Sequence, residues 1–303
     1  MKILAGISVY EADWEKLLEN VRAIIGQVDG LLLVDNASSD IGELEGWLEQ
    51  KLETKADGDL TIKEKLHWQK NDKNLGLARA LNQMFEYAKA NDFDWVLTLD
   101  QDSVCPANMI SEYKKYMKLP CLGILTPLLL DRNYTQVADH KGKAELLKEC
   151  ITSGGMSPLK VWENAGGFFD DLFIDYVDYD FSARIREHGY RIYRINSVRM
   201  LHELGRGENH RFLGRKITVL NHAPMRHYYI IRNWKYYMEI HKAVIDYSYE
   251  KKKYFFHYIK TLLYEENKLA KWKQMMRGRK DAEALIQKAK LQKRKKQNAS
   301  DFL

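Results

Sequence analysis

The stretch WVLTLDQDS, residues 95–103, is an apolar run that ends abruptly in two aspartates, Asp100 and Asp102, one residue apart. A short apolar run of this kind is typical of a strand buried in a parallel sheet. Two carboxylates so close together repel each other unless something cationic lies between them. The stretch therefore predicts a buried strand that ends in an acidic turn. It leaves open whether a metal ion, a Lys or Arg partner, or water balances the charge.

The chain before this strand alternates between short apolar runs and amphipathic segments. Strands are expected at 3–9, 30–35 and 64–69, and helices at 13–27, 41–53 and within 74–92. Such alternation is the signature of an α/β fold with a parallel sheet, which binds ligands beyond the carboxyl ends of its strands. Tyr10, Asp35 and Asp100 all lie at such ends.

The alternation is weaker after residue 103. The pattern predicts a helix at 107–118, a strand and turn at 121–131, less regular chain at 132–150, a short helix after SGGMSP, a short strand at 190–200, and helices from about residue 224 onward. We therefore expect an α/β domain at 1–225 and a C-terminal helical region at 226–303.

The composition of the 303 residues is ordinary for a folded soluble protein, with 45% hydrophobic and 30% charged residues. No stretch has the ~18 uncharged apolar residues of a membrane span, and MKILAGISVY lacks the length and cleavage site of a signal peptide. The three cysteines match no zinc pattern. These features predict a cytoplasmic protein with reduced thiols.

The net charge of +6 is unevenly distributed. Residues 251–296 contain 16 Lys and Arg against 4 Asp and Glu, a net charge of +12, whereas residues 1–250 carry −5. Such asymmetry indicates a polyanionic partner, either anionic lipid or nucleic acid.

Two segments have the composition of a nucleotide site. Asp35 ends the second strand and would either hydrogen-bond a ribose or base, or cap the turn that follows. In NLGLARALN, Gly76 permits a close backbone approach to a ligand and Arg79 lies one turn into the helix. The alternative is a glycine turn before an ordinary core helix.

The remaining candidates carry carboxylates or imidazole. Asp100 and Asp102 offer hard oxygen ligands for Mg²⁺ or Mn²⁺. Asp175, Asp178 and Asp180 lie among aromatic residues in FIDYVDYDF, where desolvation raises the basicity of a carboxylate and suits a general base. Alternatively, all three simply favour a helix N-terminus. His202, after a short strand, could ligate a metal or bind a phosphate.

Taken in order, these segments resemble the inverting family 2 glycosyltransferases of GT-A fold. The resemblance covers about residues 3–232 and rests on the ordered set VDN-x-S-x-D, NLG-x-A-x-A-x-N, LDQDS, SGG, GGF, FIDYVDYDF and H-x-LG. Within that family, LDQDS, FIDYVDYDF, HELG and NHAPMRHYYIIRN look most like bacterial rhamnosyltransferases of polysaccharide assembly.

The resemblance implies a role for each matched residue. The donor nucleotide sugar would be bound by Tyr10, Asp35, Asn74, Gly76, Arg79, Asp100, Gln101, Arg226 and Arg232. Asp100, Asp102 and His202 would hold Mn²⁺ or Mg²⁺, and Gly154, Gly155 and Asp175 would lie on the acceptor side. Asp178 would be the catalytic base. The residue before it is Val177 instead of the family's Glu, which leaves Asp175 as an alternative base.

The implied reaction is a single displacement with inversion, in which Asp178 deprotonates an acceptor hydroxyl and no enzyme nucleophile is needed. The expected donor is dTDP-rhamnose and the acceptor a lipid-linked saccharide, with UDP-hexose or UDP-N-acetylhexosamine as alternative donors. A non-enzymatic nucleotide-sugar-binding scaffold is the rival outside enzymes. A nucleotidyltransferase is disfavoured because ISVYEADWEK lacks a glycine-rich phosphate loop.

The basic tail fits the same expectation. In residues 252–276, Phe255, Ile259, Leu262, Leu269, Trp272 and Met276 fall near one helical face, with lysines beside it. Such a helix suits an anionic membrane surface, so we expect peripheral attachment at the inner face of the cell membrane. The alternative is packing on the catalytic domain or in a homodimer. No nucleic acid partner is expected, because no DNA- or RNA-binding motif is present.

Overall fold

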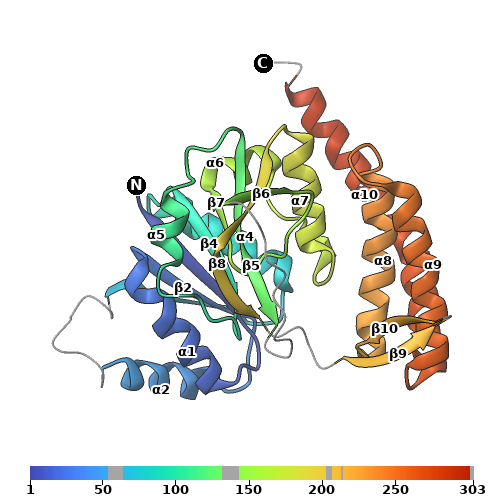
Figure 1. Cartoon of the computed structure of the whole chain (residues 1–303), viewed down its shortest axis with the longest axis horizontal. Helices are drawn as coiled ribbons and strands as arrows, with labels where there is room; N and C mark the ends of the chain where they lie inside the picture. The colour runs from blue at the N-terminus through green and yellow to red at the C-terminus, as the bar shows by residue number, and fades with distance from the viewer. Residues whose placement is uncertain (54–63, 132–142, 203–206, 213, 301–303) are drawn as a thin grey trace. The chain divides into compact units, whose positions relative to one another are not determined.

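The computed structural model describes residues 1–53, 64–131, 143–202, 207–212 and 214–300, with only the backbone at 53, 131, 202, 215, 216 and 294–300 (Figure 1). The strands are β1 (Ile3–Val9), β2 (Gly30–Asp35), β3 (Leu66–Lys70), β4 (Trp95–Asp100), β5 (Leu122–Asp131), β6 (Ala144–Leu147), β7 (Gly155–Pro158), β8 (Arg191–His202), β9 (Glu208–Phe212) and β10 (Arg215–Val219). The helices are α1 (Trp14–Ile24), α2 (Ile41–Glu53), α4 (Leu77–Ala90), α5 (Met109–Lys114), α6 (Leu159–Ala165), α7 (Val177–Glu187), α8 (Pro224–Ile240), α9 (Tyr247–Tyr264) and α10 (Lys268–Ser300), with short 3₁₀ turns at η1 (Ile25–Gln27) and η2 (Asp170–Leu172).

Eight strands form one mixed sheet in the order β3-β2-β1-β4-β7-β5-β8-β6. The first four strands in that order are parallel, as predicted, and β5 and β8 are also parallel to each other. β7 runs antiparallel to β4 and β5, and β6 antiparallel to β8. The sequence did not predict β6, β7 or the β9-β10 hairpin. The expected mostly parallel α/β fold is nevertheless confirmed.

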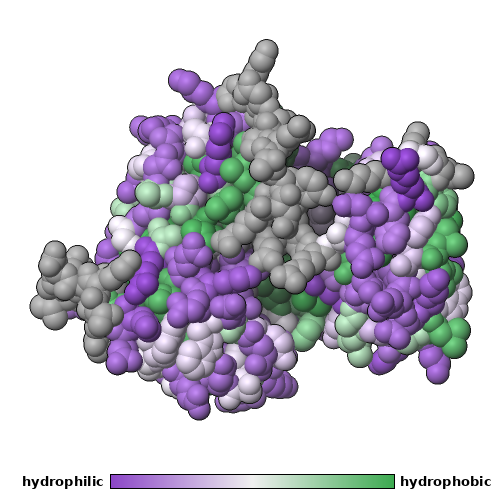
Figure 2. All heavy atoms as spheres, turned by 60° about the horizontal axis from the view of Figure 1, so that its bottom comes forward, coloured by the Kyte–Doolittle hydropathy of each residue, from purple (hydrophilic) through white to green (hydrophobic). Residues whose placement is uncertain are grey.

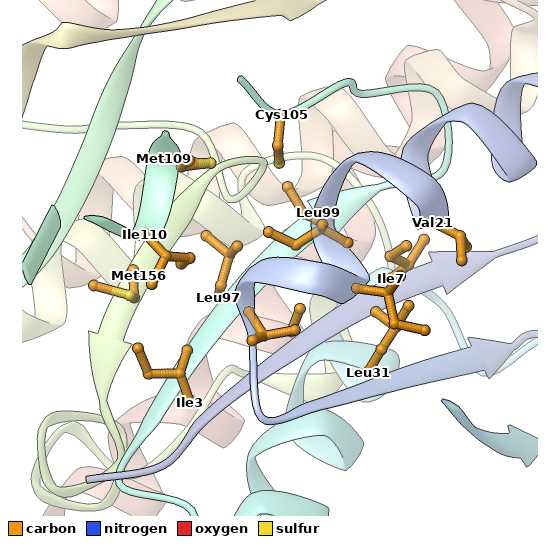
Figure 3. Close-up of a cluster of buried hydrophobic side chains, with 14 of the residues drawn as sticks. Ile3, Ile7, Val21, Leu31, Leu97, Leu99, Cys105, Met109, Ile110 and Met156 are labelled. Carbon is orange, nitrogen blue, oxygen red and sulfur yellow. The ribbon is translucent and has the colours of Figure 1, made fainter. Parts of the chain in front are cut away.

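Helices cover both faces of the parallel half of the sheet because its strands are apolar on both faces. One buried cluster joins Val21 of α1 to alternate residues of β1, among them Ile3 and Ile7 (Figure 3). On the opposite face, a side chain at Gly6 would meet the Met84 sulfur of α4 at 2.5 Å. Glycine at position 6 therefore lets α4 lie close against the sheet.

Local signals set where the first helices begin. The Asp13 side chain accepts a hydrogen bond from the Lys16 amide (3.2 Å) and so caps α1. Gly76 has φ of 84° immediately before α4, a conformation that an L-residue with a side chain rarely adopts. The first helix was expected at 13–27. In the structure α1 ends at Ile24, and residues 25–27 form a 3₁₀ turn.

The chain divides into two compact units. The first comprises Met1–Asp170 and Arg184–Glu203 and contains the eight-stranded sheet; the second comprises Asp171–Ala183 and Leu204–Leu303. Helix α7 begins in the second unit and ends in the first. The functional boundary expected at residue 226 stays a prediction.

The second unit is built on three helices. α8 and α10 pack along each other, α9 packs on both, and the β9-β10 hairpin lies against α9 (Figure 1). The continuous apolar face expected over 252–276 is interrupted, because α9 ends at Tyr264 and α10 begins at Lys268. Glu265 is turned inward to Lys271 and Asn267 has φ of 48°, so the chain changes direction there. Among the residues that the structure describes, none of the helices is long and apolar enough to cross a membrane.

Candidate active site

Three predicted site segments lie at one edge of the sheet. Val9 is in register with Asp35, and Ser8 with Asp100, so the carboxyl ends of β1, β2 and β4 lie side by side. The Tyr10 amide donates to the Gln101 side-chain oxygen (2.8 Å), and the Gln101 side-chain nitrogen donates back to the Tyr10 carbonyl (3.2 Å). These two hydrogen bonds join the two loops, and Tyr10 is 48% exposed.

The acidic turn after β4 is held from beneath by buried polar groups. The Asn20 side chain donates to the Asp100 carbonyl (2.7 Å), and the Asp100 amide donates to the Ser153 hydroxyl (3.1 Å). The hydroxyls of Ser153 and Ser103 are 2.7 Å apart, and both residues are fully buried. Such a frame fixes the backbone that carries the two carboxylates. Sequence reasoning missed Asn20, and no pattern around it singles it out.

The SGG segment supports this frame. Gly154 and Gly155 are buried at the start of β7. The Gly154 amide donates to the Thr98 carbonyl (2.8 Å), and its carbonyl accepts from the Tyr113 hydroxyl (2.9 Å). The two glycines therefore contribute backbone to the sheet, and the acceptor-side role expected for them stays a prediction.

The oxygen donors of the acidic turn fit a hard divalent cation. Asp102 is half-buried, and its carboxylate makes no hydrogen bond or ion pair within the part of the chain that the structure describes. Asp100 lies two residues before it in the same turn, so together they offer two oxygen ligands, with water and phosphate oxygens to complete the shell. His202 ends β8, and its side chain lies outside the described residues. The described residues include no group of three His, Cys, Asp or Glu suited to a metal.

Asp35 caps the turn that follows it. Its carboxylate is fully buried and accepts from the Ala37 amide (2.9 Å) and from the Ser38 hydroxyl (2.6 Å). This geometry is the turn-capping alternative that the sequence left open. A direct contact with a nucleotide base stays a prediction.

The NLG turn has the expected backbone, but its arginine is engaged elsewhere. The Gly76 amide donates to the Asn74 side-chain oxygen (2.9 Å). The Arg79 guanidinium forms two hydrogen bonds with Glu86 two turns along α4 (2.6 and 2.8 Å). These hydrogen bonds raise the pKa of Arg79, although partial burial opposes them. The donor contact expected of Arg79 stays a prediction.

Side-chain amides that were not among the predicted residues, two of them buried, join the loops beneath the strand ends. The Asn71 side chain donates to Asn36 (3.1 Å) and exchanges two hydrogen bonds with Gln83 (3.1 and 2.7 Å). Asn36 and Asn71 each follow a strand directly. An Asn immediately after an apolar run was therefore the available signal.

In the second unit, the predicted catalytic segment contains a strained turn. Phe173, Asp175 and Tyr176 have φ of 66°, 63° and 63°, which non-glycine residues rarely adopt. The buried Asn233 side chain of α8 holds this turn, because its nitrogen lies 2.9, 2.7 and 2.9 Å from the carbonyl oxygens of Leu172, Ile174 and Asp175. Strain of this kind persists only where surrounding contacts enforce it, and it is frequent at active sites.

The three aspartates of this segment have different surroundings. Asp180 is fully buried and accepts from the Tyr236 hydroxyl and from the His241 ring, both at 2.8 Å. Asp180 therefore anchors the start of α7 to α8. Asp178 is half-buried in the first turn of α7, and one carboxylate oxygen accepts from the Tyr179 amide (2.9 Å).

Asp175 is paired with an arginine. The Arg226 guanidinium contacts both of its carboxylate oxygens at 3.1–3.3 Å. Burial raises the pKa of Asp175, and Arg226 partly opposes that rise. Asp175 was predicted to lie on the acceptor side and Arg226 to bind the donor. In the structure the two residues form one ion pair, and both roles stay predictions.

Arg232 supports the same segment through its backbone. Its guanidinium donates to the carbonyls of Asp171 (2.6 Å) and Leu172 (3.0 Å) and lies over the rings of Tyr228 and Tyr229 at 5.3 and 5.0 Å. The donor contact expected of Arg232 stays a prediction.

Comparisons with known proteins agree with this architecture. The model of glycosyl transferase family 2 matches residues 5–176, more than half of the chain. The dTDP-rhamnosyl transferase RfbF of Shigella flexneri is 28% identical over 186 residues, which are 56% of this chain and 62% of that protein. The match therefore spans less than two thirds of the relative's length.

Solved structures show the same fold at low identity. S. aureus TarS residues 1–349 have a TM-score of 0.59 at 14% identity, with 93% of this chain and 81% of that chain covered. GalNAc-T7, solved with UDP, GalNAc and Mn²⁺, has a TM-score of 0.60 at 14% identity, with 93% of this chain and 54% of that chain covered. The expected GT-A fold is confirmed.

Proposed function

Because the chain belongs to glycosyl transferase family 2, we propose that it transfers L-rhamnose from dTDP-rhamnose to a hydroxyl of a saccharide acceptor, with inversion at the anomeric carbon. The observation that carries the choice of rhamnose is the 28% identity to a dTDP-rhamnosyl transferase. A UDP-hexose or UDP-N-acetylhexosamine is the alternative donor.

We place the donor at the edge where β1, β2 and β4 end. The exposed Tyr10 ring and the nearby NLG turn would receive the nucleotide, and Asp100, Asp102 and His202 would hold Mn²⁺ or Mg²⁺. When bound, the ion would neutralise charge on the diphosphate leaving group. The buried frame under Asp100 supports this proposal, since it fixes the turn before any ligand arrives.

Asp178 is the proposed catalytic base. Of the three aspartates in FIDYVDYDF, Asp180 is fully buried against His241 and Asp175 is paired with Arg226. Asp178 is half-buried in the first turn of α7, where it can accept the proton of an acceptor hydroxyl. The strained turn before it and the Asn233 contacts fix where the helix starts.

We further propose that the acceptor is a lipid-linked saccharide and that the protein works in the cytoplasm at the inner face of the membrane, with residues 226–303 as the attaching region. A homodimer through that region is the alternative. The basic charge of the region supports the membrane.

The test is calorimetric binding of dTDP-rhamnose, UDP-glucose and UDP-N-acetylglucosamine, each with Mn²⁺ and with EDTA, followed by transfer assays with the donor that binds. Metal-dependent binding of dTDP-rhamnose, with transfer that yields the inverted anomer by NMR, is the expected result. Binding of a UDP-sugar alone would move the proposal to that donor. Donor binding without transfer to any saccharide would favour the scaffold.

A further inference from the structure

Helix α9 has two apolar faces, and only one of them is covered. Tyr254, Tyr258 and Thr261 are buried against the rest of the second unit. A second face, which we call the α9 outer face, consists of Phe255, Ile259, Leu262 and Leu263, which are 49%, 45%, 37% and 52% exposed. Figure 2 shows apolar surface gathered along the outer edge of the C-terminal helices.

The outer face is continued at the start of α10. Trp272 is 39% exposed, and its ring contacts Tyr258 edge-on at 5.8 Å between centroids. Leu269 is 86% exposed one turn earlier. Because Leu269 and Trp272 belong to the helix that packs on α9, they extend the exposed apolar surface beyond one helix.

The charges around this surface are almost all positive. Within residues 247–273 the exposed charged side chains are Lys251, Lys252, Lys253, Lys268 and Lys273 against Glu266. Glu250 and Glu265 are buried. Glu250 accepts from Trp234 and pairs with Lys253 (3.0 Å), and Glu265 accepts from Lys271. Lys251 and Lys252 precede Phe255 by four and three residues, so they lie on the same side of the helix as the outer face.

We propose that the α9 outer face and its lysines bind the surface of an anionic membrane, with the apolar side chains in the acyl boundary and the lysines at the headgroups. An aromatic and aliphatic strip bordered by lysines has the chemistry of an interfacial helix. A second copy of the chain fits less well, since a two-fold interface would set the lysines of both copies against each other. The biological meaning of this surface rests on the proposed function, but its binding does not require a donor.

The test is co-sedimentation of the full chain with phosphatidylcholine vesicles, with and without 30% phosphatidylglycerol. The expected result is binding to the anionic vesicles, weakened by added salt. Ile259→Ser with Leu263→Ser should weaken it about tenfold or more. The matched control is Leu291→Ser, which changes an exposed leucine of α10 that is not part of the α9 outer face. This variant should bind as the wild type does.

Charge reversal completes the test. Lys251→Glu with Lys252→Glu should remove the preference for anionic vesicles, because each basic residue near the surface contributes to the attraction. Equal binding of wild type to both vesicle types would overturn the proposal. So would a wild-type dimer in sedimentation velocity that Ile259→Ser with Leu263→Ser converts to monomer without any vesicle binding. Donor binding should be the same in every variant. A loss of vesicle binding with donor binding unchanged concerns the α9 outer face alone and leaves the glycosyltransferase proposal intact.

Discussion

At the scale of single residues, the structure separates three carboxylates that the sequence presents as equals. Asp175, Asp178 and Asp180 lie within six residues, yet the first is paired with Arg226 and the last with His241. A local sequence pattern does not reveal these partners. Arg226 lies in α8 and His241 directly follows it, 51 and 61 residues from the aspartates they contact. The proposal that Asp178 is the base rests on the family resemblance, and the structure adds the partners of the other two aspartates.

Replacement of that base gives the first prediction. Asp178→Asn keeps the shape of the side chain and removes its basicity, so transfer should fall by about 10²–10⁴-fold while the donor dissociation constant stays within about twofold. Transfer rate and calorimetric donor binding are the two measurements. Asp175→Asn is the comparison variant. If Asp175→Asn loses transfer and Asp178→Asn does not, the base has been assigned to the wrong residue.

Asn233 gives the second residue-scale prediction. Asn233→Ala leaves three carbonyls of the strained turn without their shared donor, which should cost about 1–3 kcal/mol of unfolding free energy and lower kcat at unchanged donor affinity. Urea unfolding and kcat measure the two effects. Asn91→Ala is the control, since that side chain donates to the Tyr87 carbonyl (2.9 Å) at an exposed helix end. A kcat equal to wild type would mean that the turn does not need this residue for catalysis.

At the scale of elements, the strands with continuous apolar runs were predictable, whereas β6, β7 and the β9-β10 hairpin were not. β1, β2 and β4 are buried on both faces, so their composition alone indicates a central position. β7 has four residues, GMSP, and it is a strand only because β4 and β5 lie on its two sides. Its tertiary pairing overrides a sequence of Gly, Ser and Pro that favours a loop.

The same distinction applies to the site. The acidic turn was predictable because two aspartates follow an apolar run. Its support by Asn20 and Ser153 was not, since α1 and the segment just before β7 are brought to it only by the fold. The role of Gln101 was also unpredictable in physical terms, because an amide beside two carboxylates gives no sign that it will bond the Tyr10 backbone.

The support of the turn gives an element-scale prediction. Ser153→Ala removes the acceptor of the Asp100 amide and the partner of Ser103, so affinity for Mn²⁺ with bound donor should fall about 10–100-fold. Calorimetric titration of Mn²⁺ in the presence of donor measures this. Ser157→Ala is the matched control, since that buried hydroxyl on β7 bonds the Gly123 carbonyl and does not contact the turn. Equal losses in both variants would indicate a general effect on the sheet.

At the scale of the whole molecule, the second unit buries several ionisable groups. The His227 ring lies 2.9 Å from the Glu265 carboxylate and 3.2 Å from the His257 ring, and Lys271 donates to Glu265 (2.9 Å). These residues come from α8, α9, the junction before α10, and α10 itself. One buried polar cluster thus links all three helices, and the protonation of its members is coupled to the folding of the unit.

The last prediction follows from that coupling. Burial, reinforced by Lys260, lowers the pKa of His257 from 6.5 to about 3, and burial lowers that of His222 to about 4. For Glu265, burial alone would raise the pKa, but hydrogen bonds from His227 and Lys271 lower it to about 2. At pH values between the folded and the unfolded pKa of each group, the unfolded chain binds more protons than the folded chain. Acid therefore favours unfolding.

The free energy of unfolding should therefore be fully present above about pH 6.5 and fall as the pH drops towards 4, by up to about 1.4 kcal/mol per pH unit for each histidine kept neutral. Urea unfolding at pH 7, 6, 5 and 4 measures the slope. His257→Gln should reduce this slope by the contribution of about one proton. His188→Gln, at an exposed position, should leave the slope unchanged. A His257→Gln slope equal to that of the wild type would show that His257 is not held neutral in the fold, and the acid sensitivity would then have to come from other groups.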